Sequence, residues 1–138
     1  MELTTYFSGK KKVEVAVGPF VIHTDQSVAH GGDATAPEPF TLFLASLGAC
    51  AGVYVLGFCQ TRGIPTDDIR LEQKAEFDKS GTLSGVSIEV HVPETFPQKY
   101  LAAVQAVAEK CSVKRAFDAR PPIVVKTVQG GAKTEVRV

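Results

Sequence analysis

The strongest constraint on this chain is a run of twenty consecutive residues, 40–59, that contains no charged side chain. A run of about this length can span a bilayer, or it can form the central helix of a globular fold. Thr41, Ser46, Tyr54 and three glycines interrupt its apolar character, and no cluster of lysine and arginine directly borders it. The flanking segments alternate between apolar and polar residues, as half-buried strands do. We therefore predict a core helix and no membrane span.

The helix is predicted to begin at about Pro39, because proline suits the first turn of a helix. It should end at about Arg62, since Gly63 can cap it and Pro65 cannot continue it. The preceding residues 29–37 are small or turn-forming and predict a loop.

Alternating segments before and after this helix predict antiparallel strands, and a second helix should begin at about Pro97. One apolar stripe of the second helix includes Cys111, and residues 113–117 are predicted to form a short further turn. The fold class is therefore α+β, with antiparallel sheets and a long buried central helix in a single domain, residues 1–138. The predicted strands are 2–7, 12–17, 20–24, 69–77, 83–92, 123–128 and 134–138, with a hairpin turn at 79–81.

The predicted central helix is apolar on every side, and so must be covered on every side. One small sheet and one amphipathic helix cannot cover it in a chain of 138 residues. We therefore expect a homodimer in which the central helices of two subunits pack together. Gly48 and Gly52, four residues apart, would permit their close approach.

The balance of charges means that the protein has no overall electrostatic field that would attract a highly charged partner. Fifteen basic and fifteen acidic side chains give a formal net charge of zero, so we expect no nucleic-acid partner. Three cysteines and an opening without a basic or apolar leader favour a cytoplasmic location. No spacing of histidine, cysteine or glycine predicts a metal site or a cofactor.

The cysteines are the residues most suited to chemistry. Cys50 and Cys59 lie nine residues apart on one helix, about 180° apart around the axis and roughly 13 Å along it, so they cannot bridge. Cys111 lies in another predicted helix, which makes Cys50 and Cys111 the feasible redox pair. A sulfenic acid formed on one could be resolved by the other. The alternative is that they are small hydrophobic residues of the core.

Cys50 shares its helix face with Phe43, Ser46 and Tyr54, which predicts an apolar pocket for a small hydrophobic substrate. Ser46 and Tyr54 could instead bond to backbone carbonyls. Burial alone raises the pKa of a thiol, so a reactive Cys50 needs a nearby cation. The candidates are Lys114, Arg115, His23 and His30.

Two segments, 39–50 (PFTLFLASLGAC) and 111–116 (CSVKRA), resemble the two cysteine motifs of the OsmC/Ohr family. The resemblance implies an intertwined homodimer. It also implies a peroxidase in which Cys50 attacks an organic hydroperoxide, Cys111 resolves the sulfenic acid as a disulfide, and an external dithiol reductant restores the pair.

The chain differs from the family peroxidases at two activating positions. Phe40, which we place among the substrate-binding residues, stands where they have a glutamate, and no arginine precedes Arg62. A Phe58-Cys59 pair instead resembles the OsmC-like subgroup.

Two functions remain open. The first is a thiol peroxidase for oxidative-stress defence, an oxidoreductase with a lysine or histidine in place of the missing arginine. The second is a non-catalytic homodimer that binds a hydrophobic ligand or senses redox state. A perturbed pKa of Cys50 would separate them.

Overall fold

The computed structural model describes residues 1–130 and confirms the predicted α+β fold. Its strands form two antiparallel sheets, one before and one after the central helix. The first sheet consists of β1 (Thr4–Gly9), β2 (Lys12–Val17) and β3 (Phe20–Thr24), and the second of β4 (Arg70–Phe77) and β5 (Leu83–His91). The helical elements are η1 (Val28–His30), α1 (Pro39–Gln60), η2 (Gln98–Tyr100), α2 (Leu101–Ala108) and α3 (Ser112–Ala119).

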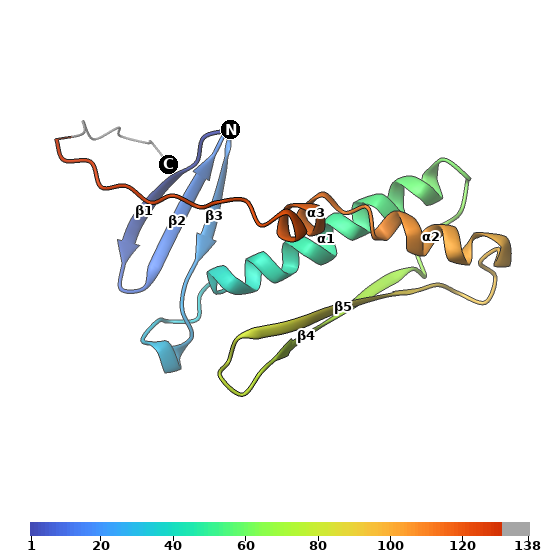
Figure 1. Ribbon diagram of the computed structural model, residues 1–138, viewed down its shortest axis with the longest axis horizontal. Coiled ribbons are helices and arrows are strands. Elements are labelled where there is room, and N and C mark those ends of the chain that lie inside the picture. Colours follow the sequence, from blue (N-terminus) through green and yellow to red (C-terminus); the bar gives the residue numbers. More distant parts are fainter. Residues whose placement is uncertain (131–138) are drawn as a thin grey trace.

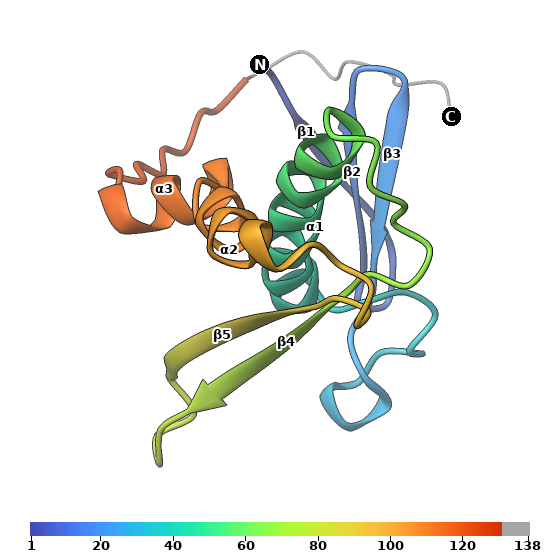
Figure 2. The ribbon, with the colours of Figure 1, turned by 90° about the vertical axis from the view of Figure 1, so that its right-hand side faces the viewer.

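Helix α1 occupies the centre of the molecule, with the other elements arranged around it (Figure 1). The β4–β5 hairpin lies beneath α1 in that view. Figure 2 shows the three-stranded sheet on one side of α1 and helices α2 and α3 on the other. The central helix α1 is therefore the element around which both sheets and the other helices are arranged.

The core forms along one stripe of α1. Its buried residues follow one another at helical spacing, so they face α2 and the hairpin together. They are Leu47, Ala51, Val55, Phe58 and Cys59. Phe96 and Val104 complete the buried set around Cys59. Alternate residues of the hairpin, such as the cross-strand pair Leu71 and Val90, pack against this cluster from below.

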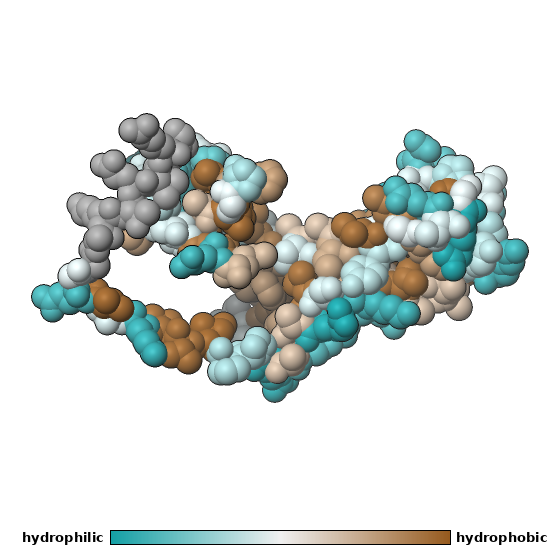
Figure 3. Space-filling view, turned by 90° about the horizontal axis from the view of Figure 1, so that it is seen from above, coloured by the Kyte–Doolittle hydropathy of each residue, from teal (hydrophilic) through white to brown (hydrophobic). Residues whose placement is uncertain are grey.

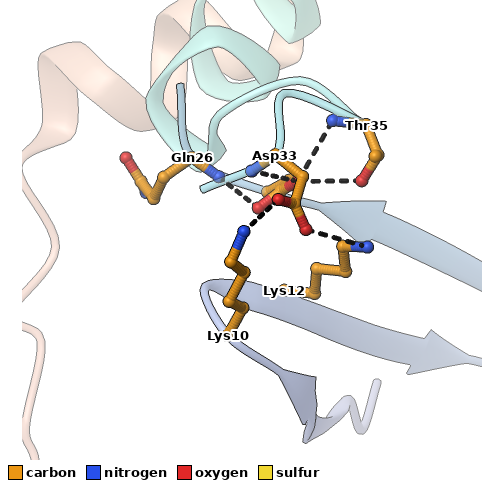
Figure 4. A network of polar contacts seen from close by, with 6 residues as sticks. Lys10, Lys12, Gln26, Asp33 and Thr35 are labelled. Carbon is orange, nitrogen blue, oxygen red and sulfur yellow. Dashed lines mark hydrogen bonds and ion pairs between the residues drawn. The ribbon is translucent and has the colours of Figure 1, made fainter. Parts of the chain in front are cut away.

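The loop that leads into α1 is organised by Asp25, a fully buried carboxylate. It accepts hydrogen bonds from the backbone amides of Gln26, Asp33 and Thr35 at 2.8, 3.2 and 3.0 Å, and from the Thr35 hydroxyl at 2.8 Å. These bonds, led by the Thr35 amide, lower the pKa of Asp25 to about 2. Lys10 of the β1–β2 turn and Lys12 at the start of β2 reach the same loop through ion pairs with Asp33 (Figure 4). The loop thereby fixes the first sheet to the start of α1.

The second helix differs from the prediction. Helix α2 ends at Ala108, and Cys111 is the residue that caps the start of a separate helix, α3. Cys111 therefore does not belong to the apolar stripe of α2, although it is buried as predicted. Helix α1 also ends at Gln60, two residues before the predicted end.

The predicted strand 123–128 is also wrong for the described part of the chain. These residues follow α3 as an extended segment without strand pairing, and they are exposed. A strand needs a neighbouring edge to satisfy its backbone groups, and no strand among residues 1–130 pairs with this segment. The predicted strand 134–138 lies outside the described residues.

Much apolar surface of the protomer is uncovered. All six residues of β2 are only half-buried, and the rings of Phe7 and Phe20 are 87% and 70% exposed. On α1, Val53 is 67% exposed. Figure 3 shows apolar side chains on the surface along the extended C-terminal segment as well. By length and composition alone α1 could also cross a membrane, but its buried stripe packs within this fold.

Candidate functional site

The candidate site is the junction between the middle of α1 and the start of α3. Cys50 projects from α1 and is half-buried. Its pKa is lowered chiefly by the backbone N–H of Val113, then by a hydrogen bond from the Cys111 side chain, and less by the Ser112 amide and the charge of Arg115. Burial opposes this shift without cancelling it. The first amides of a helix have no partner within the helix, so they can stabilise a thiolate.

Cys111 is fully buried beside this junction. Its sulfur accepts a hydrogen bond from the Lys114 amide at 3.4 Å, as the capping residue of α3. Its sulfur also lies 3.7 Å from the carbonyl oxygen of Leu47, one turn before Cys50 on α1, so its single S–H proton can bond either to this oxygen or to the Cys50 sulfur. The structure thus brings the predicted pair together through the start of α3 rather than through α2.

A second link joins the two helices just beyond Cys50. Tyr54, four residues after Cys50, shares a hydrogen bond with the hydroxyl of Ser112 at 3.1 Å. The guanidinium of Arg115 donates to the same hydroxyl at 3.3 Å. A polar chain therefore runs from Tyr54 to Arg115 across the amides that face the Cys50 sulfur.

Of the four candidate cations, only Arg115 contributes to the lowered pKa of Cys50. The other three each contact a carboxylate elsewhere in the described part of the protein. Their partners are Glu14 for His23 at 3.2 Å, Glu38 for His30 at 3.3 Å, and Asp118 for Lys114 at 2.6 Å.

The aromatic residues predicted to bind substrate form a row along the start of α1. The ring centroids of Phe40 and Phe43 lie 5.7 Å apart, and that of Phe43 lies 6.0 Å from Phe117 of α3. Phe40 also approaches Phe77 of the hairpin at 6.2 Å. The Ser46 hydroxyl donates to the carbonyl of Phe43 at 2.6 Å, so its hydrogen bond is used within the helix.

A cavity of about 750 Å³ opens beside this junction, between α1, α2, α3 and β5. Leu47 and Cys111 reach it from the side of the cysteines, and Phe117 lines it from α3. Cys50 and the residues predicted to bind substrate are not among its lining residues, so this cavity differs from the pocket predicted around Cys50. Its remaining walls include apolar residues of β5 and α2, such as Ile88, Val90 and Val104. A cavity of this size and lining can hold a small hydrophobic molecule.

Cys59 lies apart from this site. It is fully buried in the core cluster that also contains Phe58, and burial raises its pKa above the ordinary value. A buried thiol without a stabilising donor is unreactive, which makes Cys59 a packing residue.

Within residues 1–130, one cluster of side chains that could bind a metal ion lies on the outer face of the hairpin. The ligand atoms of Glu72, Glu89 and His91 lie within 4.8 Å of one another. Both glutamates are exposed, and Glu72 already accepts a hydrogen bond from Arg70 at 2.9 Å. This face points away from the core, and so away from the two cysteines.

Sequence reasoning missed Ser112 and the amide of Val113, and did not select Arg115. The available signal was the polar stretch 109–112, which interrupts the apolar stripe of α2 and offers Cys111 and Ser112 as caps for a new helix. Reading that interruption as a helix start would have placed free amides opposite Cys50.

The fold and the site define a class of α+β proteins with paired cysteines on a central helix and at a helix start. Residues 31–126 match the family described as OsmC-like protein, and the chain belongs to that family. The predicted family resemblance is thereby confirmed.

Solved structures show the same fold at low sequence identity. A candidate osmotic stress induced and detoxification response protein from Psychrobacter arcticus has a TM-score of 0.70 at 18% identity, covering 83% of this chain and 85% of its own. An OsmC-like protein from Mycoplasma pneumoniae has a TM-score of 0.68 at 12% identity, with 85% and 86% covered. An organic hydroperoxide resistance protein OsmC from Legionella pneumophila has a TM-score of 0.58 at 21% identity, with 84% and 87% covered. No curated protein matches this chain.

Proposed function

We propose that this protein is a thiol peroxidase that reduces organic hydroperoxides in oxidative-stress defence. The observation that carries the proposal is the junction that brings Cys50 and Cys111 together: Cys111 Sγ lies 3.7 Å from the carbonyl oxygen of Leu47, one turn before Cys50, and the Tyr54 hydroxyl lies 3.1 Å from Ser112 Oγ, one turn after it. The first amides of α3 and the Cys111 side chain lower the pKa of Cys50 there. Thiolates rather than thiols attack peroxides, so this placement supplies the nucleophile. The family and the Legionella pneumophila relative named for organic hydroperoxide resistance support a peroxide-related role.

The proposed reaction begins with attack of the Cys50 thiolate on one peroxide oxygen. The O–O bond breaks, the alkoxide leaves and takes a proton to become the alcohol, and Cys50 becomes a sulfenic acid. The Cys111 thiol then attacks the Cys50 sulfur, forming the disulfide and releasing water. An external dithiol reduces the disulfide and returns both thiols.

The apolar lining of the 750 Å³ cavity supports a hydrophobic peroxide as substrate. Cys111 and Leu47 lie on its wall, and Leu47 is one turn from Cys50. Phe40 and Phe43 do not line the cavity, and their row of rings meets it only through Phe117, whose centroid lies 6.0 Å from that of Phe43. These contacts favour a bulky organic group over hydrogen peroxide, which has no apolar part to bury.

We also propose that two copies form a homodimer. A three-stranded sheet with no buried face is not stable alone, and the sheet and α1 expose large apolar side chains. A second copy can cover both surfaces, and it can offer a strand edge to residues 123–128. Light scattering after size exclusion should give twice the mass of 14.7 kDa. A monomer at micromolar concentration would contradict this assembly.

The activity is tested by mixing the reduced protein with equimolar cumene hydroperoxide or hydrogen peroxide in a stopped-flow instrument. We expect rapid thiol loss with the organic peroxide and a Cys50–Cys111 disulfide by mass spectrometry. Cys50→Ser should abolish the fast phase, Cys111→Ser should leave a sulfenic acid that dimedone traps, and Cys59→Ser should behave as the wild type.

Loss of all three thiols at the slow rate of free cysteine would reject the peroxidase. The cavity would then favour the second function, a protein that binds a hydrophobic ligand. Native mass spectrometry of the protein purified from its source would then be the measurement for a bound apolar molecule.

A further inference from the structure

Arg115 stands at the start of α3, in the turn whose amides face Cys50. Its own amide donates to the carbonyl of Cys111 at 3.0 Å, which is a regular bond of the first helical turn. Its guanidinium folds back and donates to Ser112 Oγ at 3.3 Å. The side chain therefore points toward the N-terminal end of the helix, where Cys50 lies.

This position is electrostatically unfavourable for a cation. The N-terminal end of a helix carries a partial positive charge, so acidic residues are favoured there and basic residues are disfavoured. The first turn of α3 contains no acidic residue, and it carries the two cations Lys114 and Arg115. An anion at this end would relieve the repulsion, and the Cys50 thiolate is a group placed to be that anion.

Arg115 is also free of competing carboxylates. Lys114 holds Asp118 at 2.6 Å, whereas Arg115 forms no ion pair within residues 1–130. A guanidinium paired with a carboxylate would offer little net charge to a neighbouring thiol. An unpaired one keeps its charge, although its exposure to water and salt weakens the effect.

Ser112 connects Arg115 to the reacting sulfur. Its amide contributes to the lowered pKa of Cys50, and its hydroxyl lies between Tyr54 and the guanidinium. The bond from Arg115 and the bond to Tyr54 therefore hold the amides of α3 in place over α1. Arg115 thus acts on Cys50 in two ways, through its charge and through Ser112.

We propose that Arg115 is the positioning residue of the Cys50 site, holding Ser112 and the start of α3 against α1 and supplying the positive charge that favours the thiolate. This inference rests on the proposed function and names the residue that activates its nucleophile. It selects Arg115 from the four candidate cations of the sequence, in place of the lysine or histidine expected for the peroxidase.

The test compares Arg115→Gln with Arg115→Lys, and uses Lys114→Gln as the matched control because Lys114 is the adjacent cation but is paired with Asp118. The readout is the pH profile of Cys50 alkylation by iodoacetamide, followed by mass spectrometry, which requires no peroxide. We expect Arg115→Gln to move the profile to higher pH and to slow alkylation at pH 7 by about 3- to 10-fold, since a tenfold change corresponds to one pKa unit. Arg115→Lys should retain most of the wild-type rate, and Lys114→Gln should match it.

A profile for Arg115→Gln that coincides with the wild type would overturn the inference while leaving the proposed function intact. A wild-type profile like that of free cysteine would instead reject the proposed function and this inference with it. Thermal unfolding shows whether the variants fold. If Arg115→Gln does not fold, the alkylation profile of the wild type is measured at two salt concentrations, about 0.02 M and about 1 M. High salt should move this profile to higher pH, because salt screens an exposed charge. An unchanged profile in high salt would contradict a role for the Arg115 charge.

Discussion

The Tyr54 hydroxyl lies 3.1 Å from Ser112 Oγ, and this hydrogen bond joins the central helix to the first residue of α3. Tyr54 follows Cys50 by one turn of α1, and Leu47, which accepts the Cys111 thiol, precedes it by another. The start of α3 is therefore bound to α1 on both sides of Cys50. Any change that loosens these contacts should move the donor amides away from the thiolate.

Tyr54→Phe should weaken this junction. Removing the hydroxyl deletes one hydrogen bond, which costs about 1 kcal/mol of unfolding free energy. The pKa of Cys50 should rise, so alkylation at neutral pH should slow. Ser46→Ala is the matched control, because the Ser46 hydroxyl bonds only to the Phe43 carbonyl of its own helix. Equal effects of the two substitutions on Cys50 alkylation would contradict the proposed role of the Tyr54–Ser112 bond.

The lowered pKa of Cys50 makes both reactivity and stability depend on pH. Alkylation of Cys50 should reach half its maximal rate below pH 9.0, the ordinary value for a cysteine thiol. Because the folded pKa is lowered, the thiolate stabilises the fold fully above about pH 9, and this contribution is lost as the pH falls through the lowered value. Unfolding in urea across this range should show the slope for the wild type and not for Cys50→Ser. If the wild type and Cys50→Ser showed the same dependence on pH, the pKa of Cys50 would be equal in the folded and unfolded states.

Cys59 should not react in the native protein. It is fully buried and its pKa is raised, so iodoacetamide should modify it only after unfolding. Cys59→Ala should lower the unfolding free energy by about 1 kcal/mol, because it removes one buried atom of roughly the apolar size of a methylene group. Fast alkylation at Cys50 should persist in this variant. Rapid native labelling of Cys59 would contradict its placement in the core.

The elements that the sequence predicted well have a strong local signal. The uncharged run with Pro39 before it and Gly63 after it identified α1 to within two residues. The hairpin followed from alternation with a turn at 79–81, and the register places Leu71 opposite Val90 on the core side. In each case the pattern of apolar residues and the local turn chemistry predict the same element, and the tertiary contacts do not change it.

The features that the sequence did not predict depend on tertiary contacts. The break between α2 and α3 has no glycine or proline, and it is stabilised by the capping sulfur of Cys111 and its bond to Leu47, which is distant in sequence. The selection of Arg115 among four cations depends on which of the others find carboxylates. The segment 123–128 has the composition of a strand but no edge to pair with in one protomer. None of these outcomes can be deduced from local periodicity.

Gly32→Ala tests whether the Asp25 loop holds the first sheet to α1. A methyl group on Gly32 would lie 2.0 Å from the carbonyl oxygen of Gln26 and 2.8 Å from Asp25 Oδ1, so the backbone must move. We expect a loss of about 2 to 3 kcal/mol in unfolding free energy by urea denaturation. Gly57→Ala is the control, because its added methyl meets no atom within 4 Å and alanine favours a helix interior by up to about 1 kcal/mol.

The same variant should change the response to acid. The pKa of Asp25 is about 2 in the folded protein against an ordinary 3.8, so its contribution to stability is complete above pH 3.8 and is lost as the pH falls through about 2. Moving the loop in Gly32→Ala weakens the amide bonds that lower this pKa, and the unfolding free energy should therefore fall less steeply with acid in that window. An unchanged slope together with unchanged stability would mean that the loop accommodates the methyl group, and that Asp25 does not depend on the close approach of residues 26 and 32.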